Sequence, residues 1–275
     1  MNVSVNCEHF MKSAPGETER ALKESLRLCA DAGFRFFDLA TEDFAQADAA
    51  AEFMDENGLS VGQSHMPYNR YRREDYADFI TRVLRCAECA HRMGSPILVV
   101  HADEFDFSAD TFSLERAREF NVRLFAPLAD FAAKHGMRIA FENVFVEHNR
   151  QDTYRYCSKT EELLSLLEAF PSQLAGICWD SGHAKMSYGK EHIDALLRVA
   201  DRVIATHIHD NYYDRDLHLP PFMGNCDWPA FMRALRSGGF DGNLSLELHY
   251  DRVPEQIAPE WVSWLYRSAC RLSEM

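Results

Sequence analysis

The sequence contains no apolar run that approaches the roughly 18 residues of a membrane-spanning helix, so we expect no membrane association. Its N-terminal stretch, MNVSVNCEHF, lacks a basic region followed by an apolar one, and we expect no signal peptide. No Pro/Gly/Ser-rich linker, charge block or low-complexity stretch interrupts the chain. These absences predict a cytoplasmic protein whose residues 1–275 form a single domain.

Positive charge is scarce, because 29 Lys and Arg residues stand against 43 Asp and Glu residues, for a net charge of −14. Such a chain repels phosphate backbones unless it gathers its cations on one face or holds metal ions, so we expect no nucleic-acid partner. The eight cysteines show no small-domain disulfide framework and indicate reduced thiols in a cytoplasm. Cys86 and Cys89 form a CxxC pair, but they lie within a helical pattern, which favours a structural role.

Short apolar runs alternate with longer amphipathic stretches. The runs are VSVNC (3–7), FRFFDLA (34–40), LSVGQSH (59–65), PILVVH (96–101), RIAFEN (138–143), AGICWD (175–180), VIATHIH (203–209) and NLSLELH (243–249). The helical patterns between them include 17–33, 75–94, 115–136 and 227–239, and three of these four pass from a final glycine into the next strand. Eight strands, each followed by a helix, predict an α/β fold, the (β/α)₈ TIM barrel. The alternative, a doubly wound open sheet, normally has a GxGxxG loop after its first strand, and this sequence has none there.

Residues able to bind a metal stand where the predicted strands end. They are His65, His101, Glu142, Asp180, His183, His207 and Glu247, joined by Asp216 and His218 in the loop segment DLHLPP. Active sites of such barrels lie at the carboxyl ends of the strands. Ionisable side chains on apolar strands are costly to bury unless they are paired or metal-bound. The pattern therefore predicts an active site that holds a metal.

Several of these residues also have a purely structural interpretation. A single histidine after a strand, such as His65 or His101, is commonly a capping or surface residue. Asp180 and Asp210 are able to cap the helices or turns that follow them. Glu142 is harder to explain in this way, because its position should point inward or upward in a barrel. The same holds for Glu247.

The other histidines are assigned to less specific positions. His209 shares a strand with His207, and we expect only one of the two to face the barrel interior, with His207 inward and His209 turned away. The histidines expected at solvent or in loops are His9, His91, His135, His148 and His192.

Two glutamates, an aspartate and a histidine suit a hard or borderline divalent ion with open positions for substrate oxygens. Such an ion polarises a carbonyl together with a neighbouring hydroxyl and acidifies the carbon-bound hydrogen between them. One glutamate can then remove that proton, and a second on the opposite face can return it and invert the centre. Glu142 and Glu247, on separate strands, would suit this chemistry.

At these residues the sequence resembles the xylose isomerase-like barrels of sugar-phosphate isomerases and epimerases, a group that includes D-tagatose 3-epimerase. The resemblance runs from about SHMPY (64–68) through LELHY (246–250). It implies one divalent ion, Mn²⁺, Mg²⁺, Co²⁺ or Zn²⁺, held by Glu142 of FEN, Asp180 of DxxH, His207 of HxxDN and Glu247, with both glutamates doubling as acid and base. It also implies substrate contacts, which we assign to His65, His101, His183, Arg215, Asp216 and His218.

Endonuclease IV shares this fold and offers a rival interpretation. It holds three zinc ions with nine residues, and its pattern is matched here if His65, His101, His183, Asp216 and His218 are additional metal ligands. Such a site would cleave phosphodiesters. The acidic chain favours the sugar interpretation, as does the lack of that enzyme's opening segment after the first strand. So does a group of aromatic residues expected near the barrel mouth, namely Trp179, Tyr212, Tyr213, Phe222 and Trp228.

A third interpretation is a barrel that only binds a sugar, which would be expected to have lost one of the two glutamates. Since both are present, the sequence favours a metal-dependent sugar isomerase or epimerase. The partner is then a small sugar or polyol, free or phosphorylated. The resemblance also implies a homodimer or homotetramer, because members of the group pair or form tetramers.

Overall fold

The computed structural model describes residues 1–6, 18–69, 74–103, 112–146, 154–212, 215–249 and 253–275. The strands are β1 (Asn2–Asn6), β2 (Phe36–Asp38), β3 (Ser60–His65), β4 (Ile97–Val100), β5 (Arg138–Glu142), β6 (Ala175–Asp180), β7 (Val203–His207) and β8 (Asn243–Leu246). The α-helices are α1 (Thr18–Ala32), α2 (Phe44–Asn57), α3 (Tyr76–Arg92), α4 (Leu114–His135), α5 (Thr160–Leu167), α6 (Ser181–Tyr188), α7 (His192–Leu197), α8 (Trp228–Ser237) and α9 (Ala258–Ser273).

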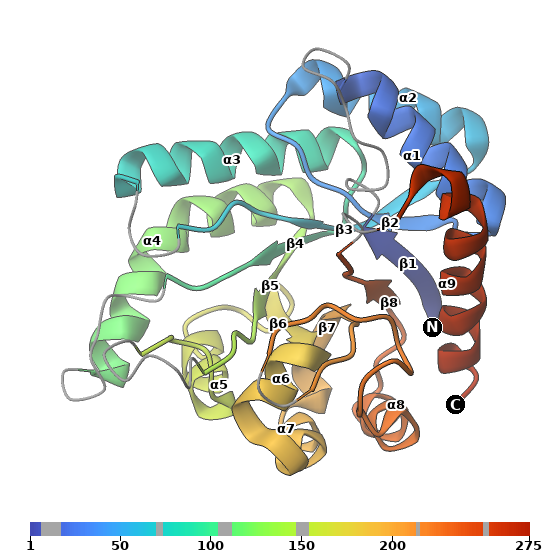
Figure 1. The fold of residues 1–275 in the computed structure, drawn as a ribbon. Coiled ribbons are helices and arrows are strands. Elements are labelled where there is room, and N and C mark those ends of the chain that lie inside the picture. Colours follow the sequence, from blue (N-terminus) through green and yellow to red (C-terminus); the bar gives the residue numbers. More distant parts are fainter. Residues whose placement is uncertain (7–17, 70–73, 104–111, 147–153, 213–214, 250–252) are drawn as a thin grey trace.

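The eight strands form one parallel sheet in the order β7-β6-β5-β4-β3-β2-β1-β8. The seam between β7 and β8 is closed just past the end of β7 by Ile208. Its N–H donates to the Ser245 carbonyl at 2.7 Å, and its own carbonyl accepts the Glu247 N–H at 3.2 Å. Helices ring the strands, and the last helix, α9, packs against α1 and β1 (Figure 1). The predicted (β/α)₈ barrel is confirmed.

The strands separate two apolar regions because successive side chains point to opposite faces. The larger region lies between strands and helices and holds Phe141 and Trp179. A small second cluster lies inside the barrel and is made by Val99, Ala140, Cys178 and Ala205. Both regions are almost completely shielded from solvent.

Local signals start and end the helices as expected. Asp43 caps α2 by accepting the N–H groups of Ala45 at 2.8 Å and Gln46 at 3.2 Å. Gly136 ends α4 with a left-handed backbone, φ 68°, which glycine adopts without strain.

The CxxC pair lies within α3, where both thiols are buried, and no disulfide joins any of the cysteines that the structure describes. None of the helices in the described ranges is long and apolar enough to cross a membrane. A single domain over the whole of residues 1–275 stays a prediction.

Candidate metal centre

A cavity of about 370 Å³ lies at the carboxyl ends of the strands. The predicted site residues that line it are His65, His101, Glu142, His183, Asp216, His218 and Glu247. Asp180 and His207 lie next to this lining and are fully buried. The folded barrel therefore brings all nine of the metal-binding side chains predicted at strand ends and in DLHLPP to one place.

Glu142 is the side chain on which most of these groups converge. It is the last residue of β5 and is 1% exposed. His207 Nδ1 lies 3.0 Å from Glu142 Oε2, and 3.7 Å from Glu247 Oε2. Together with Asp180, these residues offer ligand atoms that all lie within 4.8 Å of one another, a spacing that one metal ion could bridge.

His65 and His101 approach Glu142 from β3 and β4. His101 Nε2 lies 3.2 Å from Glu142 Oε2, and His65 Nε2 lies 3.3 Å from the same oxygen. The His65 ring is fixed by its Nδ1–H, which donates to the Met66 carbonyl at 2.8 Å. His65, Glu142 and His207 form a second group with metal-ligand spacing, which shares two members with the first.

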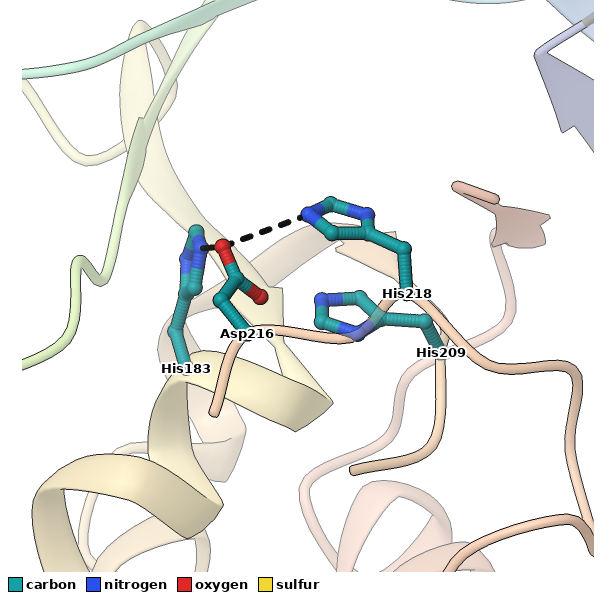
Figure 2. Close-up of side chains that lie close together, drawn as sticks. All are labelled: His183, His209, Asp216 and His218. Carbon is teal, nitrogen blue, oxygen red and sulfur yellow. Dashed lines mark ion pairs between the residues drawn. The ribbon is translucent and has the colours of Figure 1, made fainter. Parts of the chain in front are cut away.

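A third group lies on the β6–β7 side of the cavity and consists of His183, His209, Asp216 and His218. Figure 2 shows Asp216 between two imidazoles: its Oδ2 lies 3.5 Å from His183 Nε2 and 3.4 Å from His218 Nε2. The His209 ring lies beside the His218 ring, with the two stacked at 4.1 Å between centroids.

The expectation that His209 turns away from the site is wrong. Its Nε2 lies 2.9 Å from Asp180 Oδ1, and its side chain is completely buried. Residues two apart along an extended chain share a face, so His209 follows His207 inward instead of alternating with it. Gly182 makes room for the ring, since a Cβ at this position would lie 2.0 Å from His209 Cε1.

Asp180 has a capping role and a site role at once. Its Oδ1 accepts the His183 N–H at 2.7 Å and so caps α6, as the structural interpretation expected. Its own N–H donates to Asn143 Oδ1 at 2.7 Å, and Asn143 Nδ2–H donates to the Asp180 carbonyl at 2.9 Å. This pair of bonds joins the ends of β5 and β6 and fixes where the Asp180 carboxylate stands.

The imidazoles control the charge of the buried carboxyls. Burial alone would raise the pKa of Glu142, but His207 and His101 hold it well below its usual value. Burial likewise opposes ionisation of Asp180, whose pKa His183 and His209 nevertheless lower. In return, Asp180 and Asp216 outweigh burial and raise the pKa of His183 well above its usual value. A cation bound here would take over the protons' role, so its binding would release protons.

The donor set fits a divalent ion. Glu142 Oε1, His207 Nδ1 and Glu247 Oε2 are buried, and none of them makes a hydrogen bond of acceptable geometry within the described residues, although His207 Nδ1 lies close to both carboxylates. Buried polar atoms are normally satisfied, and unsatisfied ones call for a missing partner such as an ion. Carboxylate oxygens with one imidazole suit Mn²⁺, Mg²⁺, Co²⁺ or Zn²⁺. In the third group, Asp216 Oδ1 is likewise buried and makes no hydrogen bond to the residues that the structure describes.

The aromatic residues expected at the mouth are placed differently. Trp179 and Trp228 are buried in the core. Trp179 faces the helices because side chains alternate along β6, and Asp180, one residue on, faces the barrel interior. Phe222 and Tyr212 are exposed and do not line the cavity, and Tyr213 lies outside the described residues. Apart from the imidazoles, the aromatic side chains that line the cavity within the described residues are Tyr68 and Phe145.

The other histidines and Arg215 occupy different kinds of position. His192 is buried at the start of α7, where its Nδ1–H donates to the Gly189 carbonyl at 2.8 Å, so its assignment to solvent or a loop was wrong. His91 and His135 lie in α3 and α4 near the surface, whereas His9 and His148 are outside the described residues. Arg215 is exposed and is not among the side chains that line the cavity.

Sequence reasoning missed several site residues. Asp38 ends β2, and its Oδ2 accepts hydrogen bonds from Gln63 Nε2 at 2.8 Å and His207 Nε2 at 3.1 Å. His249 lines the cavity and stacks on His218 at 4.2 Å. Both carried a signal, because Asp38 stands at a strand end and His249 follows Glu247 by two residues. Tyr68, Phe145 and Arg155, in connections after strands, carried none.

The sequence matches the model of the xylose isomerase-like TIM barrel family over residues 26–268. The chain therefore belongs to this family. A curated relative, the uncharacterised protein y4fM of Sinorhizobium fredii, is 34% identical over 170 residues, which are 60% of this chain and 51% of that protein. The chain thus spans about half the length of this relative.

Solved structures show the same fold at low identity. A D-tagatose 3-epimerase-like protein superposes with a TM-score of 0.76 at 18% identity, covering 100% of this chain and 98% of the other. The IolI protein with a bound zinc atom superposes with a TM-score of 0.73 at 18% identity, covering 100% of this chain and 98% of the other. An AP endonuclease of family 2 from Brucella melitensis gives 0.71 at 18%, covering 95% and 98%. Sugar epimerases and an endonuclease thus share this architecture.

Proposed function

We propose that this member of the family is a divalent-metal-dependent isomerase or epimerase of a sugar or polyol, acting by proton transfer beside a carbonyl. The observation that carries the proposal is the convergence of Glu142 and Glu247 on His207, at 3.0 and 3.7 Å from its Nδ1. The two carboxylates come from strands that are not neighbours in the sheet. They therefore reach one point of the cavity from different directions, as removal and return of a proton require.

Glu142, Asp180, His207 and Glu247 would hold the ion, since their ligand atoms lie within 4.8 Å of one another. The buried, unsatisfied atoms of Glu142, His207 and Glu247 support this assignment. When bound, the ion supplies polarisation of a substrate carbonyl and hydroxyl. One of the two glutamates then accepts the carbon-bound proton and the other delivers one. His183, held by its Nδ1–H to the Asn143 carbonyl at 2.9 Å, is positioned to bind a substrate oxygen.

The dimensions of the cavity support a small substrate. About 370 Å³ lies within the usual range of small-molecule sites. Tyr68, stacked on His101 at 4.9 Å between ring centroids, offers an aromatic face to the C–H surface of a sugar. A cytoplasmic location, a homodimer or homotetramer, and the absence of a nucleic-acid partner remain parts of this proposal.

The third ligand group favours a second candidate, a multi-zinc phosphodiesterase. His183, Asp216 and His218 form a donor set beside the first group, as two or three clustered ions would need. Clustered metal ions clamp the attacking and leaving oxygens of a phosphodiester. In the single-ion proposal the same three residues would contact the substrate instead.

Elemental analysis of protein purified without chelators separates the two candidates. About one manganese, magnesium, cobalt or zinc ion per chain would support the isomerase, and Asp180→Asn should lower that content while the exposed Asp201→Asn should not. The next measurement is exchange of carbon-bound hydrogen with deuterium across a panel of ketoses. Two or three zinc ions, with cleavage of phosphodiesters and no exchange, would overturn the isomerase proposal in favour of the second candidate.

A further inference from the structure

We propose that Asp38 is a positioning residue of the metal centre, which fixes the His207 ring so that the Nδ1 atom of this ring faces the ion. The inference rests on the metal centre of the proposed function but not on its proton chemistry. It goes beyond that function, in which Asp38 is neither a ligand nor an acid/base group.

An irregularity in the sheet places Asp38 beside Gln63. Phe37 of β2 pairs with Val61 of β3, but the next residue, Asp38, pairs with Gln63 instead of Gly62. In a regular strand, Gln63 would share a face with Val61, which packs in the core between strands and helices. The extra residue reverses the alternation, so Gln63 meets Asp38 in the barrel interior, where Asp38 lines the cavity. Bulges re-aim side chains in this way, often next to active sites.

The hydrogen bonds of Gln63 determine which end of its amide faces Asp38. Its Nε2 lies 3.2 Å from the Thr206 carbonyl, which can only accept, and 2.8 Å from Asp38 Oδ2. Nε2 is therefore the donor to both oxygens. These bonds cross the barrel interior, because Thr206 lies in β7, which β4, β5 and β6 separate from β3.

The same carboxylate oxygen determines which nitrogen of His207 carries a proton. Asp38 Oδ2 lies 3.1 Å from His207 Nε2, and since a carboxylate oxygen accepts, Nε2–H is the donor. In a neutral imidazole the other nitrogen then has a free lone pair. That nitrogen, Nδ1, lies 3.0 Å from Glu142 Oε2 and 3.7 Å from Glu247 Oε2, among the groups that would hold the ion.

Asp38 acts on the centre through His207 and not as a ligand. It belongs to none of the groups with metal-ligand spacing among the described residues. A buried carboxylate is costly without partners, and here the donors of Gln63 and His207 compensate it. A carboxylate behind a metal-bound imidazole orients the ring and makes it a stronger ligand. We therefore expect Asp38 to contribute to metal affinity.

The test compares zinc affinity in Asp38→Ala, Asp38→Asn and the unmodified protein, by competition with a chelator of known affinity. Asp38→Ala should weaken zinc binding by about tenfold to a hundredfold. Asp38→Asn keeps an oxygen that accepts a weaker bond, so its loss should be smaller but measurable. The matched control is Asp103→Asn, at a buried carboxylate after β4 that accepts from the Tyr76 hydroxyl at 2.9 Å. This control should bind zinc like the unmodified protein.

A spectroscopic measurement separates positioning of the ring from general support of the fold. Hydrogen–nitrogen NMR correlation spectra of the zinc-loaded protein show which nitrogen of the His207 ring carries a proton. We expect a protonated Nε2, with its hydrogen shifted downfield by the bond to a carboxylate. This resonance should move upfield in Asp38→Asn and further in Asp38→Ala, and it should stay in place in Asp103→Asn.

Unchanged zinc affinity in both Asp38 variants, or no zinc binding by the unmodified protein, would overturn the inference. A loss of affinity that leaves the Nε2 hydrogen in place would also overturn it, because Asp38 would then support the fold and not the ring. If Asp38→Ala fails to fold, as its melting temperature would show, the affinity and the spectrum of Asp38→Asn still decide.

The result is independent of the isomerase chemistry. Zinc affinity that depends on Asp38, without hydrogen exchange on any ketose, would leave this inference standing and refute the proposed function. Exchange on a ketose, with a zinc affinity that does not depend on Asp38, would do the reverse.

Discussion

Two layers of side chains inside the barrel come from the same four strands but differ in chemistry. The floor layer consists of Val99, Ala140, Cys178 and Ala205, and the rim layer above it consists of His101, Glu142, Asp180 and His207. Each rim residue follows a floor residue by two positions in β4–β7 or directly after them, so each pair shares a strand face. The same four strands thus provide an apolar plug and, one step higher, a set of metal-binding groups.

Burial does not distinguish the two layers. Cys178 in the floor and Asp180 in the rim are both completely buried. The partners differ: floor residues contact one another, whereas the rim carboxylates face imidazoles, and Glu142 retains an unsatisfied oxygen. Buried charge without a partner is costly, so the rim is maintained for chemistry and the floor for stability.

The largest expected effect comes from removing Glu247, an acid/base group that lies beside the rim layer, 3.7 Å from His207. Glu247→Gln should retain part of the metal binding but lower the rate of proton transfer by about a thousandfold, since an amide cannot accept the proton. Deuterium exchange at the substrate carbon, beside metal analysis, measures both quantities. Glu168→Gln, at the outer end of α5, serves as the control. Undiminished turnover in Glu247→Gln would refute its assigned role.

A buried carboxyl without imidazole neighbours should behave in the opposite way from Glu142. Burial raises the pKa of Glu162, in α5, from 4.5 to about 7. Because the folded-state pKa is the higher one, its stabilising contribution is complete below pH 4.5 and is lost as the pH rises through 7. The glutamine of Glu162→Gln does not titrate, so the unfolding free energy of this variant should rise relative to that of the unmodified protein between pH 5 and pH 8. The expected rise is up to about 3 kcal/mol.

Urea denaturation of Glu162→Gln and of the unmodified protein, each at pH 5 and at pH 8, measures this difference. The effects of other titrating groups cancel when the two proteins are compared at the same pH. A difference that stays constant with pH would show that Glu162 does not titrate in this range.

The inward placement of His209 predicts a smaller effect, on metal affinity. His209→Ala removes the imidazole that holds Asp180 at 2.9 Å, and loss of such a supporting residue typically weakens metal binding by about tenfold to a hundredfold. Competition with a chelator of known affinity measures the change. His91→Ala, on the outer surface of α3, is the matched control. Equal affinity in both variants would show that His209 does not support metal binding.

The smallest expected effect belongs to the floor. Val99→Ala removes two methyl groups from the cluster and should lower the unfolding free energy by about 1–2 kcal/mol. The loss should be the same with metal and with chelator, because no ligand atom is involved. Chemical denaturation under both conditions provides the measurement, and a loss that depends on metal would show that the two layers are coupled.

Much of the barrel and its rim could be predicted because their signals are local. Alternating apolar runs mark all eight strands, and strand ends marked His65, Glu142 and His207 before any contact was known. Asp38 also stands at a strand end, but its role depends on closure of the barrel, which brings it to His207 across 169 positions of sequence. Arg155 escaped for another reason: it lies in a connection, where neither periodicity nor a strand end indicates the direction of a side chain.

Gly182 constrains which side chain can stand at position 209. Its backbone is that of an ordinary helical residue, so it is required for space and not for conformation. Any side chain at 182 would displace the imidazole at 209 and free the Asp180 carboxylate that it holds. The two positions are therefore coupled: a residue larger than glycine at 182 requires a side chain smaller than histidine at 209.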